Sequence, residues 1–162
     1  MSVAAATVRA GFRLADENAT AGLARRLAAL ARAGDVIALW GPLGAGKTSF
    51  ARAFIGALGA KEEVPSPTFT LVQAYPLALA TVWHFDLFRL SSPEEARELG
   101  LEDALDGGIS LIEWPDRLGA LLPEQRLDVM LAFDDGRRRA ELIGHGDWTT
   151  RLQAWREPDD KL

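Results

Sequence analysis

Residues 38–50, ALWGPLGAGKTSF, decide the fold class of this chain. An apolar run precedes a glycine-rich turn that ends in Lys47 and Thr48, and the stretch matches G-x-x-x-x-G-K-[ST] at every fixed position. Glycines let successive backbone amides turn toward one point, and a following helix directs its positive end to the same place. The stretch therefore predicts a phosphate-binding loop between a buried strand and a helix.

The flanking residues supply the strand and the helix that this loop requires. Residues 35–40 (DVIALW) form a short apolar run that predicts a strand buried on both faces. Residues 48–59 predict a helix that ends at Gly59, and residues 15–34 predict an earlier helix, capped by Asp16 or Asn18. The order strand, loop, helix is the context in which the motif is meaningful.

The remainder of the chain alternates strand and helix signals. Short apolar runs predict strands at 68–75, 80–88 and 109–113. Ser92-Pro93-Glu94-Glu95 predicts a capping box that opens a helix at Pro93, running to about residue 100. Residues 126–133 and 137–143 flank Asp134-Asp135-Gly136 and predict a hairpin, and Asp147 caps a predicted last helix that ends at Trp155.

These elements predict one domain of α/β class over residues 1–162, in which residues 124–157 form a C-terminal β-hairpin and a short helix. A length of 162 residues, 48% of them hydrophobic, suits one core of this kind.

Composition excludes several classes of function. The chain has no cysteine, which rules out disulfides, thiolate zinc sites and thiol catalysis. Its 18 Lys+Arg against 23 Asp+Glu give a net charge of -5, so we expect any contact with nucleic acid to run through a partner. Without a signal-like or membrane-length apolar segment, we expect a cytoplasmic protein that does not bind membranes.

The motif also assigns chemistry to its last residues. Lys47 would reach the outer phosphates of a nucleotide, and the Thr48 hydroxyl would bind Mg²⁺. Magnesium held by a hydroxyl and phosphates still needs a carboxylate at the end of a neighbouring strand. Asp86 and Glu113 each end an apolar run and meet that description, whereas Glu102, Asp103 and Asp116 have polar neighbours typical of solvated loops.

Other side chains carry weaker signals. A structural salt bridge, to Arg89 or Arg117, is the alternative role for Asp86 and Glu113. Ser66 and Thr68 lie where nucleotide switches place a hydroxyl, whereas Thr70 is an ordinary strand residue. His84, inside an apolar run, reads as a core histidine. Trp114 either packs in the core or moves when the nucleotide changes.

Motifs that are missing from the chain limit which nucleotide it binds and which reaction uses that nucleotide. The [NT]-K-x-D element that reads guanine is missing, which favours ATP, and no LSGGQ stretch indicates a transport ATPase. A small-molecule kinase stays open, because Arg137–Arg139 could imitate a lid, although a solvated strand edge is the commoner explanation. A non-catalytic, ATP-dependent binding module is the third possibility.

Five segments together resemble one known family. GPLGAGKTSF (41–50), SPTFTLV (66–72), HFDLFRL (84–90), SPEEARELG (92–100) and IEWPDRL (112–118) occur in the order and at the spacing of the TsaE (YjeE) family. The resemblance covers roughly residues 14–144. Pro42, Phe69 and Phe88 depart from the residues common at those positions.

The resemblance implies a P-loop ATPase domain with a P-loop NTPase-like three-layer fold, in which helices flank a mixed parallel and antiparallel sheet. It also implies a weak Mg²⁺-dependent ATPase that is needed to form N6-threonylcarbamoyladenosine in tRNA. It would act with TsaB and TsaD, meet tRNA only through that complex, and use ATP and Mg²⁺ as cofactors. Lys47, Asp86 and Glu113 would be catalytic, with Thr48 and Glu113 as magnesium ligands and Ser66, Thr68 and Trp114 in the switches. The nucleotide would be bound by Leu43, Gly44, Ala45, Gly46, Lys47, Thr48, Ser49 and Arg138.

Overall fold

The computed structural model describes residues 7–61, 64–67 and 70–155. In chain order its elements are β1 (Val8–Leu14), α1 (Glu17–Ala28), β2 (Val36–Trp40), α2 (Lys47–Ala57), β3 (Val72–Pro76), β4 (Thr81–Asp86), α3 (Glu95–Glu98), α4 (Leu101–Leu105), β5 (Ile109–Glu113), the 3-10 helix η1 (Pro115–Leu121), β6 (Leu127–Asp134), β7 (Arg137–Gly144) and α5 (Asp147–Trp155). The described residues contain no helix long and apolar enough to cross a membrane.

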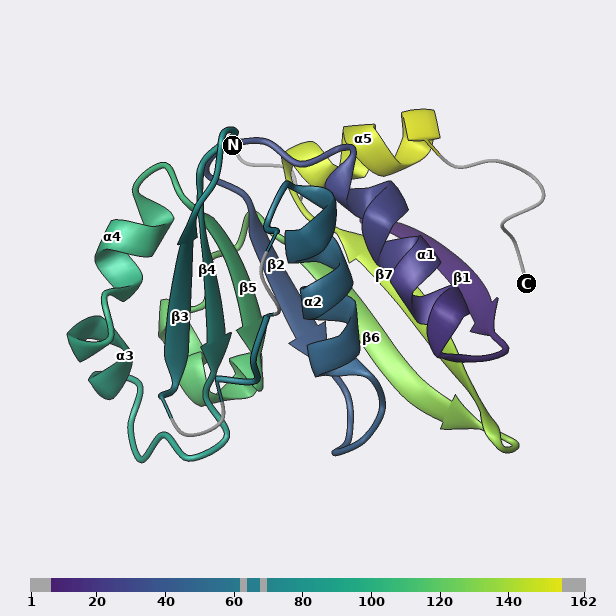
Figure 1. Cartoon of the computed structure of the whole chain (residues 1–162), viewed down its shortest axis with the longest axis horizontal. Helices are drawn as coiled ribbons and strands as arrows, with labels where there is room; N and C mark the ends of the chain where they lie inside the picture. The colour runs from purple at the N-terminus through teal and green to yellow at the C-terminus, as the bar shows by residue number, and fades with distance from the viewer. Residues whose placement is uncertain (1–6, 62–63, 68–69, 156–162) are drawn as a thin grey trace, which may run out of the picture.

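A single seven-stranded sheet organises the fold, in the order β1-β7-β6-β2-β5-β4-β3 (Figure 1). The strands β6, β2, β5 and β4 run parallel to one another, and β1, β7 and β3 are antiparallel to their neighbours. The predicted mixed sheet flanked by helices is therefore confirmed. Because β2 lies at its centre, both of its faces are covered, as its continuous apolar run predicts.

Alternation along the strands divides the core into two layers. Ile37 and Leu39 of β2 belong to one buried cluster, which also holds Leu23 of α1, Phe50 of α2 and Leu152 of α5. α1 and α2 lie side by side over this face of the sheet (Figure 1). The opposite-facing residues build the second layer with α3, α4 and η1: Val36, Phe85, Leu87, Leu90, Ala96, Leu101, Ala104, Ile112 and Leu118. The sheet thus lies between two helical layers.

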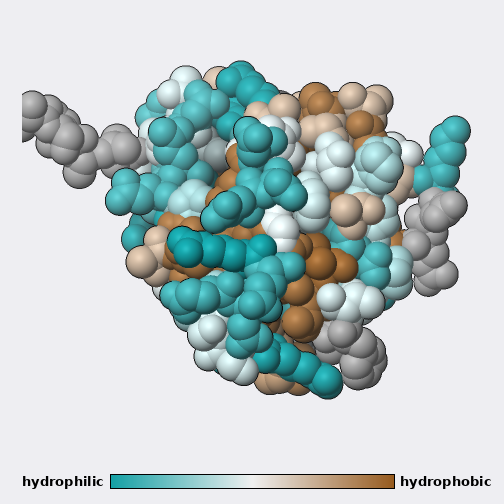
Figure 2. Space-filling model, turned by 90° about the vertical axis from the view of Figure 1, so that its left-hand side faces the viewer, coloured by the Kyte–Doolittle hydropathy of each residue, from teal (hydrophilic) through white to brown (hydrophobic). Residues whose placement is uncertain are grey.

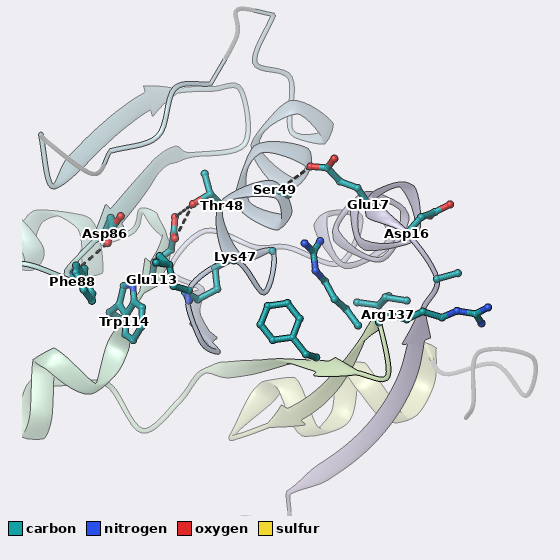
Figure 3. Close-up of a pocket in the computed structure, with 18 residues that line it drawn as sticks. Asp16, Glu17, Lys47, Thr48, Ser49, Asp86, Phe88, Glu113, Trp114 and Arg137 are labelled. Carbon is teal, nitrogen blue, oxygen red and sulfur yellow. Dashed lines mark hydrogen bonds between the residues drawn. The ribbon is translucent and has the colours of Figure 1, made fainter.

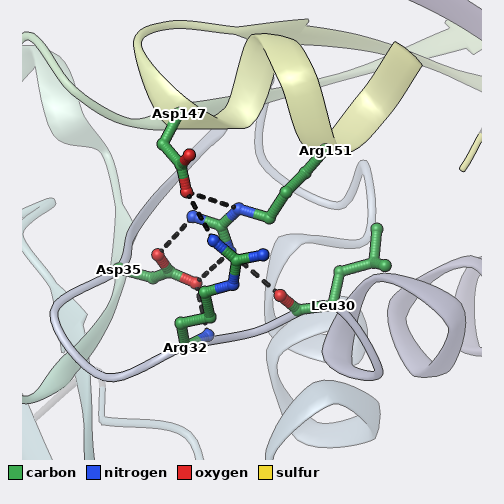
Figure 4. A network of polar contacts seen from close by, with 5 residues as sticks. All are labelled: Leu30, Arg32, Asp35, Asp147 and Arg151. Carbon is green, nitrogen blue, oxygen red and sulfur yellow. Dashed lines mark hydrogen bonds and ion pairs between the residues drawn. The ribbon is translucent and has the colours of Figure 1, made fainter. Parts of the chain in front are cut away.

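A buried ion-pair network joins the start of β2 to the last helix. Arg151 of α5 donates from Nη1 and Nη2 to the two carboxylate oxygens of Asp35, at 2.8 and 2.7 Å, and Nη1 also reaches the Leu30 carbonyl at 2.9 Å. Both charged side chains are only 8% exposed. Asp147 and Arg32 extend the network toward solvent (Figure 4). Burial alone would lower the pKa of Arg151, but the hydrogen bonds and charges of Asp35 and Asp147 together outweigh burial and raise that pKa.

Most predicted elements are present, with shifted ends. Asp16 caps α1 by accepting from the Ala19 amide at 2.9 Å, but the helix ends at Ala28 instead of continuing to Gly34. The hairpin of β6 and β7 turns through Asp135 and Gly136, both with positive φ, as a tight two-residue turn requires. α5 spans Asp147–Trp155 as predicted; the Asp147 carboxylate binds Arg32 and Arg151.

Several expectations were wrong. The helix expected from Pro93 begins two residues later, at Glu95, and no side chain caps its first turn. Half of the predicted capping box is present, because the Glu95 carboxylate accepts from the Ser92 amide, and also from the Ser91 amide. Thr70 precedes β3, which begins at Val72, because Leu71 adopts a positive φ that interrupts an extended chain. Glu102 and Asp103 are exposed on helix α4, not on a loop. Figure 2 views the side of the molecule on which α4 lies, and its surface is largely hydrophilic with hydrophobic groups between.

Strand β1 was not predicted from the sequence. Its presence determines where Arg137–Arg139 lie in the sheet. Val8, Ala10, Phe12 and Leu14 alternate inward along β1, with Arg9, Gly11 and Arg13 between them. This period of two is the signal of a half-buried strand, and the sequence interpretation overlooked it. β1 pairs with β7 along its whole length. Arg137–Arg139 therefore begin an interior strand, and their expected place at a sheet edge was wrong.

Candidate functional site

The loop between β2 and α2 has the backbone that its glycines predict. Gly41, Gly44 and Gly46 all have positive φ, and Gly46 is the residue before the first turn of α2. At Gly41 a Cβ atom would lie 2.5 Å from the Leu131 carbonyl oxygen, so only glycine fits there. The loop therefore turns tightly against β6 and leaves the N-terminal amides of α2 facing outward, which is a site for anions.

Lys47 is held at the base of this loop. Its side chain is buried, and Nζ donates to the carbonyls of Gly41 and Pro42. Nζ also lies 4.2 Å from the ring centre of Trp114, whose left-handed backbone directs the residue across the end of β5. Burial lowers the pKa of Lys47, while the charges of Glu113, Asp86 and Asp116 oppose that shift. The cation is thus pre-positioned beside the phosphate loop.

Two carboxylates end adjacent parallel strands next to α2. Asp86 of β4 and Glu113 of β5 are directly paired in register, so both project from the same edge toward the same face as α2. Glu113 is buried and accepts from the Thr48 hydroxyl, with Oγ1 at 2.9 and 3.0 Å from its two oxygens. Asp86 accepts from the Phe88 amide at 3.2 Å. Among the described residues, Glu113 does not form the salt bridge to Arg117 that was its alternative role.

These groups surround one pocket of about 590 Å³ (Figure 3). It lies at the carboxyl ends of the parallel strands, where open α/β sheets bind ligands, and its size suits a small molecule. Its lining comprises Leu14, Ala15, Asp16, Glu17, Leu43, Gly44, Gly46, Lys47, Thr48, Ser49, Asp86, Phe88, Glu113, Trp114, Phe133, Gly136, Arg137 and Arg138.

The structure brings most of the predicted site residues to this pocket. Ala45 is the exception within the loop, because its side chain is buried in the core. Arg138 comes from β7, and its Nη1 lies 3.6 Å from the position of a Cβ built on Gly46. Ser66 does not line the pocket, and Thr68 lies outside the described residues.

Sequence reasoning missed the other side of the pocket. Asp16 and Glu17, at the start of α1, line it, and Glu17 accepts from the Ser49 hydroxyl at 2.8 Å. Phe133 and Arg137 come from the β6–β7 hairpin. No local signal could have found these residues, because they reach the pocket only through the packing of α1 on α2 and the pairing of β6 with β2.

The oxygen donors fit magnesium bound together with a nucleotide. A hydroxyl and a carboxylate within hydrogen-bonding distance, beside a phosphate loop, are the hard ligands that Mg²⁺ uses when phosphates and water complete its shell. Among the described residues, no three His, Cys, Asp or Glu side chains form a metal cage. Thr48 and Glu113 would hold the ion, which would neutralise phosphate charge.

Comparison with known proteins agrees with this geometry. The family model described as "Threonylcarbamoyl adenosine biosynthesis protein TsaE" matches residues 14–140. A tRNA threonylcarbamoyladenosine biosynthesis protein TsaE from Rickettsia conorii is 42% identical over 132 residues, covering 80% of this chain and 75% of the relative. Its counterpart from Bacillus subtilis is 37% identical over 129 residues, covering 78% and 80%.

A solved structure shares the whole architecture. The crystal structure of Bacillus subtilis YdiB superposes with a TM-score of 0.76 at 28% identity, covering 92% of this chain and 94% of that one. The sheet, the phosphate loop and the sequence match therefore converge on one nucleotide-binding P-loop fold, and the chain belongs to the TsaE family of threonylcarbamoyl adenosine biosynthesis proteins.

Proposed function

We propose that this protein binds ATP with Mg²⁺ and hydrolyses it slowly, as a subunit required to form N6-threonylcarbamoyladenosine in tRNA. The observation that carries the proposal is the contact of the Thr48 hydroxyl with Glu113 at the amino end of α2. It joins a magnesium-binding pair to a phosphate loop. The chain's membership of the TsaE family supports the tRNA-modifying role, and we place that role in the cytoplasm.

In this proposal each residue of the pocket has its own role in binding or hydrolysing ATP. The loop amides from Leu43 to Ser49 hold the phosphates, Lys47 neutralises the terminal phosphate, and Thr48 and Glu113 hold the magnesium. Asp86, beside Glu113, orients the attacking water or accepts its proton. Arg138, whose Nη1 lies beside Gly46, contributes a second cation to the pocket.

The partners in this proposal are TsaB and TsaD, with tRNA reached through them. Leu43, Phe88 and Phe133 line the pocket with 78%, 44% and 57% of their surface exposed. Large apolar side chains gathered around a charged pocket are typical of a surface that a protein partner covers. The excess of acidic residues also disfavours direct binding of RNA.

A small-molecule kinase is the rival enzyme class. Its lid would have to come from Arg137–Arg139, but these residues belong to β7, which is paired on both sides. A strand with two partners cannot close over a substrate as a mobile lid does. A product analysis with labelled ATP separates the classes, because a kinase transfers the phosphate to a metabolite and the proposed ATPase transfers it to water.

Adding TsaB and TsaD is expected to raise the rate of ATP hydrolysis. A transition-state cation supplied by a partner is worth on the order of 10³-fold in other phosphate-loop hydrolases, so even partial completion of the site gives about tenfold. The measurement is phosphate release by the chain alone, by TsaB and TsaD alone, and by the mixture. Additive rates in the mixture would contradict the proposed partnership.

Replacing Glu113 with glutamine tests the magnesium site and the non-catalytic alternative together. The amide keeps the shape but loses the charge that binds the cation, so we expect about 100-fold slower hydrolysis. Glu102→Gln, an exposed carboxylate on α4, is the matched control and should retain the wild-type rate. If Glu113→Gln abolishes hydrolysis yet supports complete tRNA modification, the protein is a binding module instead of an ATPase in this pathway.

A further inference from the structure

His84 contacts Glu113 of the site from within the protein core, although it does not line the pocket. It is fully buried on β4, and its Nε2 lies 2.7 Å from Oε2 of Glu113. β4 and β5 pair in parallel, and His84 lies two residues before Asp86 on the same face of the sheet. Glu113 is therefore approached by Thr48 from α2 and by His84 from the neighbouring strand.

The direction of this hydrogen bond follows from its partner. A carboxylate offers only acceptors, so the hydrogen lies on Nε2, and His84 donates it to Glu113. The other ring nitrogen, Nδ1, is buried without a hydrogen-bond partner among the described residues. Contact with Glu113 is thus the one hydrogen bond made by this ring within the described chain.

That arrangement is costly for a residue that only fills space. An unpartnered buried polar atom keeps the desolvation cost of a missing hydrogen bond, and leucine would fill a similar volume without that cost. The expected core role of His84 accounts for its burial but not for this cost. A use for the donor at Nε2 does account for it.

The donor restricts a flexible side chain at a critical point. Glutamate has several flexible side-chain torsions and loses rotamer entropy when it is fixed. His84 holds Oε2, while Thr48 lies close to both oxygens, so the carboxylate is already turned toward the amino end of α2. Groups that hydrogen-bond metal-binding carboxylates set their orientation, and losing them typically costs 10–100-fold in metal affinity.

We propose that His84 is a positioning residue, which holds the Glu113 carboxylate against Thr48 in the orientation that receives the magnesium of a bound nucleotide. This inference rests on the proposed function, because it needs a magnesium nucleotide in the pocket. It adds a residue that acts through Glu113 and touches neither the nucleotide nor the ion.

The test compares His84→Leu with His84→Gln. Leucine removes the donor, whereas the glutamine amide nitrogen occupies a place similar to that of imidazole Nε2 and can still donate. The measurement is binding of a fluorescent ATP analogue during titration with Mg²⁺, which gives the magnesium concentration at half-maximal binding. We expect His84→Leu to raise that midpoint 10–100-fold and His84→Gln to keep it within about threefold of the wild type.

Two controls separate positioning from general damage. Nucleotide binding in the presence of EDTA should be the same in wild type and His84→Leu, because the phosphate loop is untouched. Ser110→Ala changes a buried polar residue of β5 on the opposite face from Glu113, and it should leave the midpoint unmoved. His84→Met, which is flexible and similar in size, replaces the leucine variant if that one does not fold.

An unmoved magnesium midpoint in a folded donor-free variant would overturn the proposal, as would equal losses in His84→Gln and His84→Leu. Failure of the proposed function looks different. There the wild-type protein itself binds no nucleotide, or binds it without any dependence on Mg²⁺.

Discussion

Replacing Lys47 with alanine should lower kcat/KM for ATP hydrolysis by about 100-fold or more. The ammonium group is buried at the base of the phosphate loop, and it already lies beside the carbonyls of Gly41 and Pro42. A fixed cation next to developing phosphate charge needs little reorganisation during the reaction, and removing one such group typically costs 10²–10³-fold. The measurement is steady-state phosphate release over a range of ATP concentrations.

The same variant should remain folded. Burial lowers the pKa of Lys47, so the folded protein gains little free energy from holding this charge without a ligand. We therefore expect lost activity with a nearly unchanged melting temperature. Lys61→Ala removes an exposed lysine beyond the end of α2 and should match the wild type in both measurements. A Lys47→Ala variant with more than a tenth of the wild-type activity would show that another group neutralises the phosphates.

Replacing Arg151 with methionine should reduce the free energy of unfolding by about 3–5 kcal/mol, the largest stability effect that we expect from a single polar substitution. The change leaves Asp35 buried at the start of the central strand without its two strongest hydrogen-bond donors. Methionine retains much of the side-chain volume, so the loss reports the charge and not a cavity. Urea denaturation measures it directly.

A double variant and a variant of an exposed neighbouring residue are the controls for this experiment. Asp35→Asn combined with Arg151→Met removes the unpaired buried carboxylate and should recover at least about 1 kcal/mol of the lost free energy of unfolding. Arg32→Met breaks only the exposed pair with Asp147 and should cost less than about 1 kcal/mol. Additive effects of Asp35→Asn and Arg151→Met would mean that the two side chains contribute independently, against the network in Figure 4.

Local signals explain what could be predicted. The phosphate loop is encoded within eight residues, because its glycines, its lysine and the start of α2 are consecutive in the chain. The strand ends at Asp86 and Glu113 were found in the same way, since each carboxylate follows its own apolar run. That both carboxylates meet beside Thr48 is a property of strand order, which two separate runs do not contain.

Non-local pairings explain what was missed. The alternation along β1 is local, but its partner is not: the register with β7 sets Val8 against Gly144, near the other end of the chain. Arg151 meets Asp35 from 116 positions away, and His84 meets Glu113 from 29. None of these pairings produces a periodicity or a residue spacing in the sequence from which the two partners could be predicted.

By itself, then, the sequence determined the phosphate loop, the α/β class and the two acidic strand ends, because hydrophobic period and glycine geometry act over a few neighbouring residues. Tertiary structure alone decided which charges are paired, which side chains close the far wall of the pocket, and that a buried histidine supports Glu113. Burial and hydrogen-bond partners depend on which strands become neighbours, and that is settled by the packing of the whole chain.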